Sequence, residues 1–154
     1  MTWQGIIAFI WMLILLFMLG YFWRYRSKFK TSQAWPVAKG QITELIWVKK
    51  DHFLWADIQY SYVVNGVSYA NNSLFIEQRF RSPKSAYARQ VAYQAALAYE
   101  KGEDIRVFYN PSNPQEAALD TRVPLKLTII LVLLGAFLLF HVSSFIFGNI
   151  WWQG

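Results

Sequence analysis

The sequence predicts a membrane protein of the α+β class, in which two transmembrane helices flank a small, mostly antiparallel β-sheet domain with one helix. Two long apolar runs, residues 2–23 and 125–150, predict the helices, and the first has no charge between Trp3 and Trp23. About 20 apolar residues in a helix cross a hydrocarbon core of about 30 Å. Between the runs, short β-favouring segments alternate with turn signals, which predicts the sheet.

Tryptophans mark the ends of both apolar runs. Trp3 and Trp23 bracket the first run, and Trp151 and Trp152 follow the second. Indole rings favour the interface between lipid and water, so these positions fit two membrane-spanning helices. No basic residue precedes the first run, and no small-residue cleavage site follows it. We therefore expect the first run to remain as an anchor and not to be removed as a signal peptide.

The placement of charge predicts the orientation in the membrane. All 15 Lys and Arg residues lie between Arg24 and Lys126. Residues 44–121 hold eight basic and nine acidic side chains, so the net charge of +6 comes from residues that flank the apolar runs. The positive-inside rule places the central domain in the cytoplasm and both termini in the periplasm of a bacterial inner membrane. Six flanking residues are candidates for contact with anionic lipid head groups: Arg24, Arg26, Lys28, Lys30, Arg122 and Lys126.

Residues 24–34 form a basic juxtamembrane arm, and the soluble domain follows at residues 35–121. The arm is expected to continue the first helix until Trp35 and Pro36, because proline lacks an amide hydrogen and restricts the residue before it. The arm is either a surface that binds lipid or the ordinary basic flank of a membrane helix. Because the basic excess lies at the membrane and not on the domain, no nucleic acid is expected as a partner.

The soluble domain is expected to begin with three strands. Residues 37–48 are rich in β-favouring side chains, and residues 53–64 alternate apolar with polar positions, which is the period of a half-buried strand. Asn65-Gly66 predicts a type I′ hairpin turn, which requires positive φ at both positions. Residues 67–76 then form the returning strand.

One helix and further extended segments complete the domain. Ser82 and Pro83 predict the start of the helix, since serine caps free amides and proline suits the first helical position. An alanine-rich run then leads to Gly102, the expected C-cap. Residues 105–109 predict a fourth strand, and the two Asn-Pro pairs in residues 110–114 predict a loop before a short edge strand. The expected apolar stripe of the helix is Tyr87, Val91, Ala95 and Ala98.

Three stretches of the domain occur in an order that resembles one bacterial family. They read WPVAKGQI at residues 35–42, YSYVVNGVSY at residues 60–69 and GEDIRVFYNPSNP at residues 102–114. Together, between two apolar runs, they resemble the domain-of-unknown-function family 3592. The resemblance implies a small β-rich domain held by membrane helices. It does not imply catalytic residues at any position of this sequence. Its tyrosines are expected to cover a sheet face while their hydroxyls reach water: Tyr60, Tyr62, Tyr69 and Tyr109.

Residues that support catalysis are few. The chain has no cysteine, which excludes disulfides, thiolate catalysis and cysteine-ligated zinc. His52 stands beside Asp51 in a predicted turn, without a nucleophile-elbow pattern. The sequence contains neither a phosphate loop nor a dinucleotide-binding glycine pattern. We therefore expect a protein that is not an enzyme and that has no cofactor and no metal.

His141 is the candidate functional group inside the membrane. Histidine can remain neutral there and hydrogen-bond a neighbouring helix. The two spans must be antiparallel, and counting from Trp23 and Lys126 places His141 at the depth of Ala8. Its expected role is helix packing, with a partner contact and proton chemistry as alternatives. The candidates for helix packing or partner contact are Gly5, Ala8, His141, Ser144 and Gly148.

The tethered domain is predicted to bind another protein, as an accessory or assembly subunit of a membrane complex. Two features favour this function: the lack of a catalytic set, and the double tether, which limits the freedom of the domain. The first alternative is an immunity protein that neutralises a secreted toxin. A weaker alternative is an enzyme that acts on lipid head groups, with His52 and Asp51 as its active residues.

Overall fold

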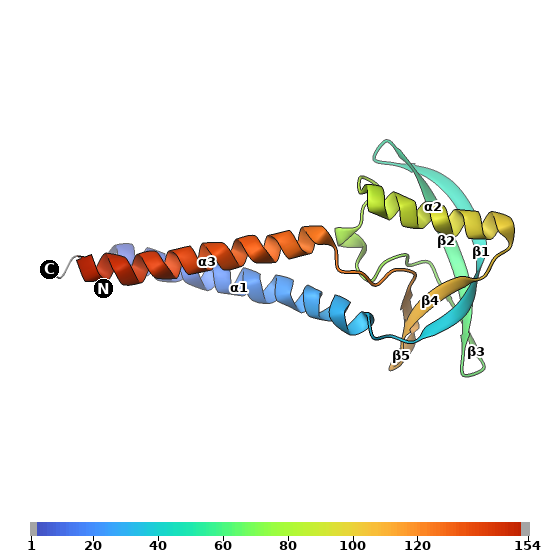
Figure 1. The fold of residues 1–154 in the computed structure, drawn as a ribbon, viewed down its shortest axis with the longest axis horizontal. Coiled ribbons are helices and arrows are strands. Elements are labelled where there is room, and N and C mark those ends of the chain that lie inside the picture. Colours follow the sequence, from blue (N-terminus) through green and yellow to red (C-terminus); the bar gives the residue numbers. More distant parts are fainter. Residues whose placement is uncertain (1–2, 152–154) are drawn as a thin grey trace. The chain divides into compact units, whose positions relative to one another are not determined.

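Two compact units make up the chain in the computed structural model, which describes residues 3–151 (Figure 1). One unit holds two long helices, and the other, Phe29–Arg122, holds a sheet and a shorter helix. The prediction of two apolar helices that flank, along the chain, a small antiparallel sheet with one helix is confirmed. In chain order the elements are α1 (Trp3–Ser32), β1 (Val37–Lys50), β2 (Phe53–Val64), β3 (Val67–Asn71), the 3₁₀ helix η1 (Gln78–Phe80), α2 (Ala86–Lys101), β4 (Ile105–Asn110), β5 (Asn113–Ala118) and α3 (Leu125–Trp151).

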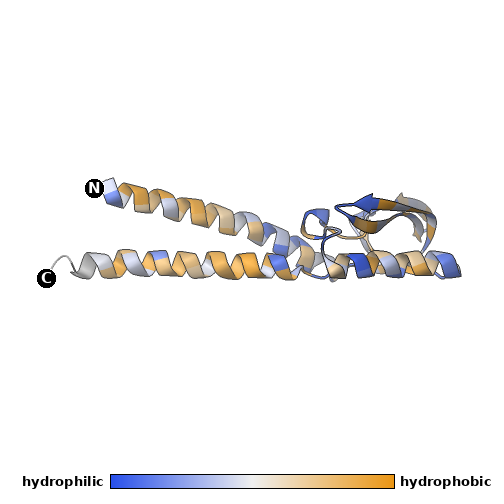
Figure 2. Ribbon diagram, turned by 90° about the horizontal axis from the view of Figure 1, so that it is seen from above, coloured by the Kyte–Doolittle hydropathy of each residue, from blue (hydrophilic) through white to orange (hydrophobic). Residues whose placement is uncertain are grey.

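The helices α1 and α3 are long enough and apolar enough to cross a membrane. α1 has 30 residues and α3 has 27, and a rise of about 1.5 Å per residue makes each longer than a hydrocarbon core of about 30 Å. Hydrophobic residues cover most of both helices in Figure 2, and large apolar side chains such as Phe17 and Leu139 are exposed. Trp152, one of the predicted anchors, lies outside the described residues.

Partly buried residues follow a repeat of three and four along α1, at Gly5, Ala8, Met12, Leu15 and Leu19. α3 has the same repeat, at the buried Leu131 and the partly buried Leu134, Leu138 and His141. Two helices that cross at a small angle with left-handed packing bury side chains at this spacing. The repeat therefore marks the sides on which α1 and α3 face each other.

The domain contains a sheet of five antiparallel strands in the order β3-β2-β1-β4-β5. The central strand β1 pairs with β2 along most of its length, but with β4 only over Val37–Gly40. The turns Asp51-His52 and Asn65-Gly66 close the two hairpins of β2, and all four turn residues have positive φ, as a type I′ turn requires. The predicted Asn-Gly hairpin is confirmed.

The sheet curls until its two edge strands approach each other. The side-chain amide of Asn71, at the end of β3, donates to the carbonyl of Gln115 in β5 at 2.9 Å. The hydroxyl of Tyr62 reaches across from β2 and donates to the carbonyl of Pro114, also in β5, at 2.6 Å. The first hydrogen bond joins the two edge strands, and the second joins β2, the neighbour of one edge strand, to β5 at the other edge, so both hold the curl.

Aromatic side chains of β2 fill the interior of the curled sheet. Tyr60 and Tyr62 are almost fully buried, and their ring centres lie 6.0 Å apart. Tyr60 donates its hydroxyl proton to the carbonyl of Ser73 at 2.7 Å. The prediction that these two hydroxyls reach water is therefore wrong, because the curl turns this face of β2 into the core.

Two strand boundaries differ from the sequence prediction. Residues 110–114 were expected to form a loop, but Pro114 lies in β5. Because β5 is an edge strand, one side of its backbone needs no pairing and a proline is tolerated. The strand β3 ends early, at Asn71, whose side-chain oxygen accepts hydrogen bonds from the amides of Asn72 and Ser73 and so forms a turn.

The helix α2 begins three residues later than predicted. Ser82 and Pro83 belong to a tight turn, in which the Ser85 amide donates to the Ser82 carbonyl at 2.9 Å. Ser85 is the N-cap, and its hydroxyl accepts a hydrogen bond from the Ala88 amide. Gly102 ends the helix with a left-handed φ of 66°, which confirms the predicted C-cap.

Alanines form the buried face of α2, which packs on β1 and β2 in Figure 1. Only Ala95 of the predicted stripe is fully buried, because Tyr87 and Val91 lie one residue to the side and line a groove. Small side chains bring this helix close to the curved sheet. The buried residues of α2 are Ala88, Ala92, Ala95 and Ala96.

Candidate binding groove

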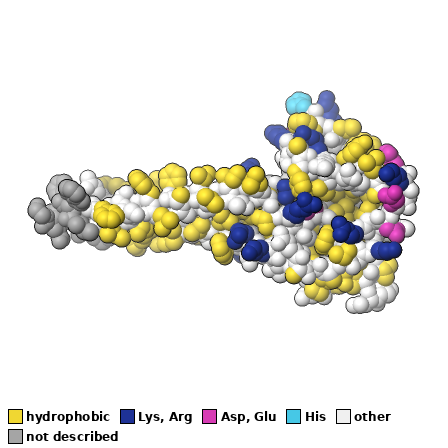
Figure 3. Space-filling view, in the orientation of Figure 1, with side chains coloured by type: hydrophobic (Ala, Val, Ile, Leu, Met, Phe, Trp, Pro, Cys, Tyr) yellow, Lys and Arg dark blue, Asp and Glu magenta, His cyan; other side chains and the backbone are white. Residues whose placement is uncertain are grey.

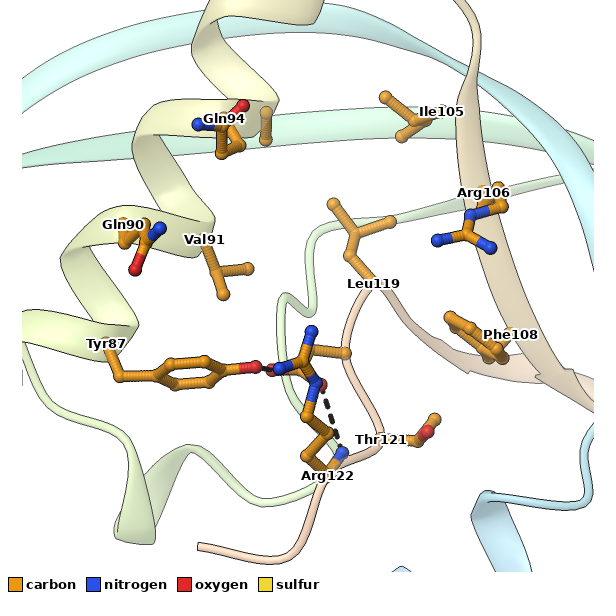
Figure 4. A pocket seen from close by; sticks show the side chains of 12 residues that line it. Tyr87, Gln90, Val91, Gln94, Ile105, Arg106, Phe108, Leu119, Thr121 and Arg122 are labelled. Atoms are coloured by element: carbon orange, nitrogen blue, oxygen red, sulfur yellow. Dashed lines mark hydrogen bonds and ion pairs between the residues drawn. The ribbon is translucent and has the colours of Figure 1, made fainter.

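A groove of about 600 Å³ opens in the domain between α2 and β4. Figure 4 shows it from close by: Gln90 and Gln94 project from α2, Arg106 projects from β4, and Leu119 lies between them on the segment that follows β5. The groove lies entirely within the compact unit Phe29–Arg122. Its lining residues are Tyr87, Gln90, Val91, Gln94, Ala95, Ile105, Arg106, Phe108, Leu119, Asp120, Thr121 and Arg122.

A buried carboxylate organises one end of the groove. Asp120 is only 8% exposed, and its Oδ2 accepts a hydrogen bond from the hydroxyl of Tyr87. Its Oδ1 accepts a hydrogen bond from the Arg122 amide at 3.0 Å and lies 3.7 Å from Nε of the same arginine. The negative charge of Asp120 is therefore compensated inside the protein, and a buried charge is tolerated only when it is paired in this way.

Arginine side chains gather around the ring of Tyr87. The Cζ atom of Arg81 lies 4.4 Å from the ring centre, and that of Arg122 lies 5.4 Å from it. Arg81 also donates to the carbonyl of Arg122 at 3.3 Å. Guanidinium groups stack on aromatic faces by cation–π attraction. Two positive charges thus meet one negative charge, that of Asp120, at this end of the groove.

Arg106 supplies a further positive charge on the opposite wall. Its side chain is exposed, points into the groove in Figure 4, and has no hydrogen bond or ion pair to the residues that the structure describes. Between the arginines lie apolar side chains, among them Val91, Ile105 and Leu119. Such a surface suits a ligand with an anionic group beside an apolar portion, because a guanidinium pairs with carboxylate or phosphate through two parallel hydrogen bonds.

Buried tyrosine hydroxyls make the domain sensitive to alkaline pH. Burial raises the pKa of Tyr87 to about 12, and the hydrogen bond to Asp120 and the charge of that carboxylate contribute further. Burial, and to a lesser degree Tyr62, also raises the pKa of Tyr60. In the unfolded chain tyrosine ionises near pH 10, at about its ordinary pKa. Above that pH the folded state holds protons that the unfolded state has lost, so the free energy of unfolding falls as pH rises.

We therefore expect urea unfolding of the domain, followed by near-ultraviolet circular dichroism in mild detergent, to show constant stability up to about pH 9 and a steady loss above about pH 10. Tyr87→Phe is expected to lower the free energy of unfolding at neutral pH by about 1 kcal/mol and to reduce the alkaline slope. An alkaline slope identical in the variant and the natural chain would show that Tyr87 does not contribute.

The six predicted lipid-contact residues lie in different settings. Arg26 lies against Trp23, with its Cζ atom 5.4 Å from the ring centre. Arg122 lines the groove and forms an ion pair with Asp120. It therefore has a role inside the domain in addition to the predicted contact with lipid. The other four side chains are exposed on α1 and α3: Arg24, Lys28, Lys30 and Lys126.

The predicted helix-packing residues divide into two groups. His141 Nε2 lies 2.9 Å from the carbonyl oxygen of Ala8, and Ala8 and Gly5 are on the partly buried side of α1. Ser144 and Gly148 are exposed, and outside the chain neighbours and adjacent helix backbone of Gly148 no described atom lies within 4 Å of a Cβ atom placed on it. Figure 2 shows α1 and α3 farther apart toward the N- and C-terminal ends, and the packing of Ser144 and Gly148 against α1 stays a prediction.

The contact between His141 and Ala8 leads to a test of the helix pair. His141→Ala should cost only about 0.6 kcal/mol, the average for a hydrogen bond between membrane helices. Ala8→Leu should cost more, about 1–3 kcal/mol, because the larger side chain overpacks the interface. The yield of a disulfide between Met12→Cys and Leu138→Cys, in the full chain in lipid, measures both effects. Phe9→Leu, on the exposed side of α1, is the control; a larger loss for His141→Ala than for Ala8→Leu contradicts this account.

Asp51 and His52, the residues considered for catalysis, form the two-residue turn between β1 and β2. Both side chains are exposed and both residues have a left-handed backbone, with φ of 50° and 66°. They do not line the groove. Their positions follow from the geometry of the hairpin turn.

The residues that define the groove were not identified from the sequence. Tyr87 and Asp120 are separated by 33 residues, and only the packing of α2 beside the segment after β5 brings them together. Arg106 belongs to the stretch that resembles the family, but a single arginine in a strand has no recognisable pattern. The one sequence signal for the groove was Tyr87 on the predicted apolar stripe of the helix. A tyrosine that is buried on such a stripe usually needs a hydrogen-bond partner for its hydroxyl.

The fold and the groove define a class of protein: a domain of one curled antiparallel sheet and one packed helix, preceded and followed in the chain by a long apolar helix. Residues 39–124, more than half of the chain, match a domain of unknown function, DUF3592, and the chain belongs to this family. The resemblance predicted from the three stretches is confirmed, although the first stretch begins at Trp35, before the matched region. No curated protein and no solved structure matches the chain.

Proposed function

We propose that this chain is a two-pass protein of the bacterial inner membrane that is not an enzyme, and that its domain binds a segment of another protein. In this proposal the domain faces the cytoplasm, both termini are periplasmic, and the protein is an accessory or assembly subunit of a membrane complex. Two helices of sufficient length and hydropathy, with basic residues only on the domain side of each, support the orientation.

The groove beside α2 is the observation that carries this proposal. Its volume of about 600 Å³ is sufficient for a few side chains of a partner. The Arg106 guanidinium faces it from one wall, and exposed amides from Gln90 and Gln94 face it from the other. Arginine and apolar side chains in a concave surface are typical of sites that contribute most to protein binding.

Photocrosslinking in cells tests the groove directly. A photoreactive amino acid replaces Gln94, which lines the groove, or the adjacent Tyr93, which is exposed on another side of the same helix. We expect a discrete crosslinked product from position 94 and none from position 93. Arg106→Glu in addition should lower the yield by roughly tenfold or more, as the loss of a charge-assisted hydrogen bond implies. Equal products from both positions, or none from either, would refute a protein site in this groove.

The identity of the crosslinked protein separates the functions. A resident membrane protein supports an accessory or assembly subunit. A secreted toxin whose toxicity this chain relieves supports an immunity protein. The third candidate, an enzyme acting on lipid head groups, requires that His52→Ala or Asp51→Ala abolishes function with expression intact.

A further inference from the structure

The tip of the β1–β2 hairpin exposes large apolar side chains. Its large side chains are Trp47, 41% exposed, Phe53, 37% exposed, and Leu54, 64% exposed. Because Lys49 pairs with Leu54 and Trp47 pairs with Ala56, the side chains of Trp47, Lys49 and Leu54 lie on the same face of the hairpin. Two large apolar side chains and a lysine therefore share one exposed face.

The start of α2 joins this tip. The guanidinium of Arg89 lies 4.3 Å from the ring centre of Phe53, on the opposite face of the hairpin from Leu54. The same guanidinium donates to the carbonyls of Pro83 and Lys84, at 2.6 Å and 3.0 Å. Through Arg89, the tip and the turn before α2 form one surface. We call it the hairpin end, and it consists of Trp47, Lys49, Lys50, Phe53, Leu54, Lys84 and Arg89.

Basic side chains outnumber acids at the hairpin end, whereas the other end of α2 carries acids together with Lys101. The acids closest to the tip are Asp51 and Asp57, and Asp57 is held by Lys50 at 3.7 Å. Glu100, Glu103 and Asp104 lie at and after the C-terminal end of α2. Figure 3 shows dark blue and yellow side chains near the cyan histidine of the hairpin tip, and magenta acids interspersed with dark blue side chains at the far edge of the domain.

We propose that the hairpin end inserts into the surface of an anionic lipid bilayer. Exposed tryptophan favours the interface between lipid and water, leucine and phenylalanine favour the region below it, and lysine can extend its charge back to the head groups. Anionic head groups complement the positive charge that remains when the four cationic side chains of the hairpin end are set against Asp51 and Asp57. The inference rests on the proposed membrane anchoring, because it requires a bilayer beside the domain. The lipid contact that it assigns is separate from the proposed protein site in the groove.

The second hairpin of β2 provides a matched comparison. It also has a two-residue type I′ turn and exposed apolar side chains, Val63 at 58% and Val67 at 52%. No lysine or arginine occurs between residues 51 and 78. If apolar exposure alone drove insertion, both hairpins would enter the bilayer.

An environment-sensitive dye on a single cysteine tests the proposal, since the natural chain has no cysteine. The full chain carrying Leu54→Cys or Val67→Cys is placed in nanodiscs of phosphatidylcholine alone or with phosphatidylglycerol. In the anionic nanodiscs we expect the dye at position 54 to shift to shorter wavelength and to be quenched by nitroxide-labelled lipid. The dye at position 67 should keep its emission in water. Removing the three lysines together, with Lys49→Gln, Lys50→Gln and Lys84→Gln, should reduce insertion by roughly fivefold for each charge.

Three results would overturn the proposal. In the first, the dye at position 54 remains in water in both kinds of nanodisc. In the second, its emission shifts but nitroxide-labelled lipid does not quench it, which indicates contact with protein or with a second copy of the chain. In the third, the dye inserts equally well when the three lysines are replaced and when anionic lipid is left out. Failure of the chain to enter nanodiscs at all would instead refute the membrane anchoring. Circular dichroism of each labelled variant establishes that the domain is folded.

Discussion

Tyr60→Ala is expected to lower the free energy of unfolding of the domain by about 3–5 kcal/mol, the usual loss when a large aromatic side chain is removed from a core. Tyr60 has no exposed surface, contacts the ring of Tyr62 and donates a hydrogen bond to the carbonyl of Ser73. A domain of this size has a total stability of only about 5–15 kcal/mol. Much of it would therefore be lost with this one side chain.

Two variants separate packing from hydrogen bonding at this position. Tyr60→Phe keeps the ring but removes the hydroxyl, so its expected cost is about 1 kcal/mol. Tyr93→Ala removes a tyrosine that is 54% exposed and should cost less than about 0.5 kcal/mol. Urea unfolding of the full chain in mild detergent, followed by near-ultraviolet circular dichroism, compares all three. If Tyr60→Ala and Tyr93→Ala have similar stability, the interior of the sheet is not packed around Tyr60.

Gly40→Val is the second substitution with a large expected effect. A Cβ atom on Gly40 would lie 2.6 Å from Cγ2 of Val107 and 3.0 Å from the carbonyl oxygen of Ser61. Val107 is fully buried, and Ser61 pairs with Gln41 in the β1–β2 ladder, so neither neighbour can move freely. Overpacking of this kind costs about 1–3 kcal/mol, and the two further methyl groups of valine place the effect at the upper end.

The adjacent residue is the control for Gly40. Lys39 has an exposed side chain and only a surface ion pair with Asp104, at 3.8 Å. Lys39→Ala should therefore change stability by less than about 1 kcal/mol. Thermal unfolding of Gly40→Val and Lys39→Ala measures the difference. Equal melting temperatures would show that β1, β2 and β4 do not approach as closely at Gly40 as the structure places them.

Local signals in the sequence predicted most of the elements. Asn65-Gly66 predicted a hairpin because its turn requires positive φ, and Gly102 predicted the end of α2 for the same reason. Ser82-Pro83 misled the assignment of the helix start, because the same pair also suits a tight turn, and Ser85 provides an equally good cap.

Local sequence patterns did not predict the contacts between residues that are distant in the chain. The hydroxyl of Tyr62 reaches Pro114, 52 residues later, and this contact depends on the curl of the whole sheet. Alternation along β2 predicted which side chains share a face, but not that this face is enclosed. The groove was missed for the same reason, since Tyr87, Arg106 and Asp120 come from three separate elements.

The most direct test of the proposed membrane arrangement is the accessibility of single cysteines in intact cells. Val67→Cys places a thiol on an exposed strand of the domain, and Gln153→Cys places one near the C-terminus. A maleimide that cannot cross the inner membrane is expected to label Gln153→Cys in intact cells and Val67→Cys only after lysis. Labelling of Val67→Cys but not of Gln153→Cys in intact cells would contradict the proposed orientation. Labelling of both would contradict a domain that lies on the cytoplasmic side of the inner membrane between two membrane spans.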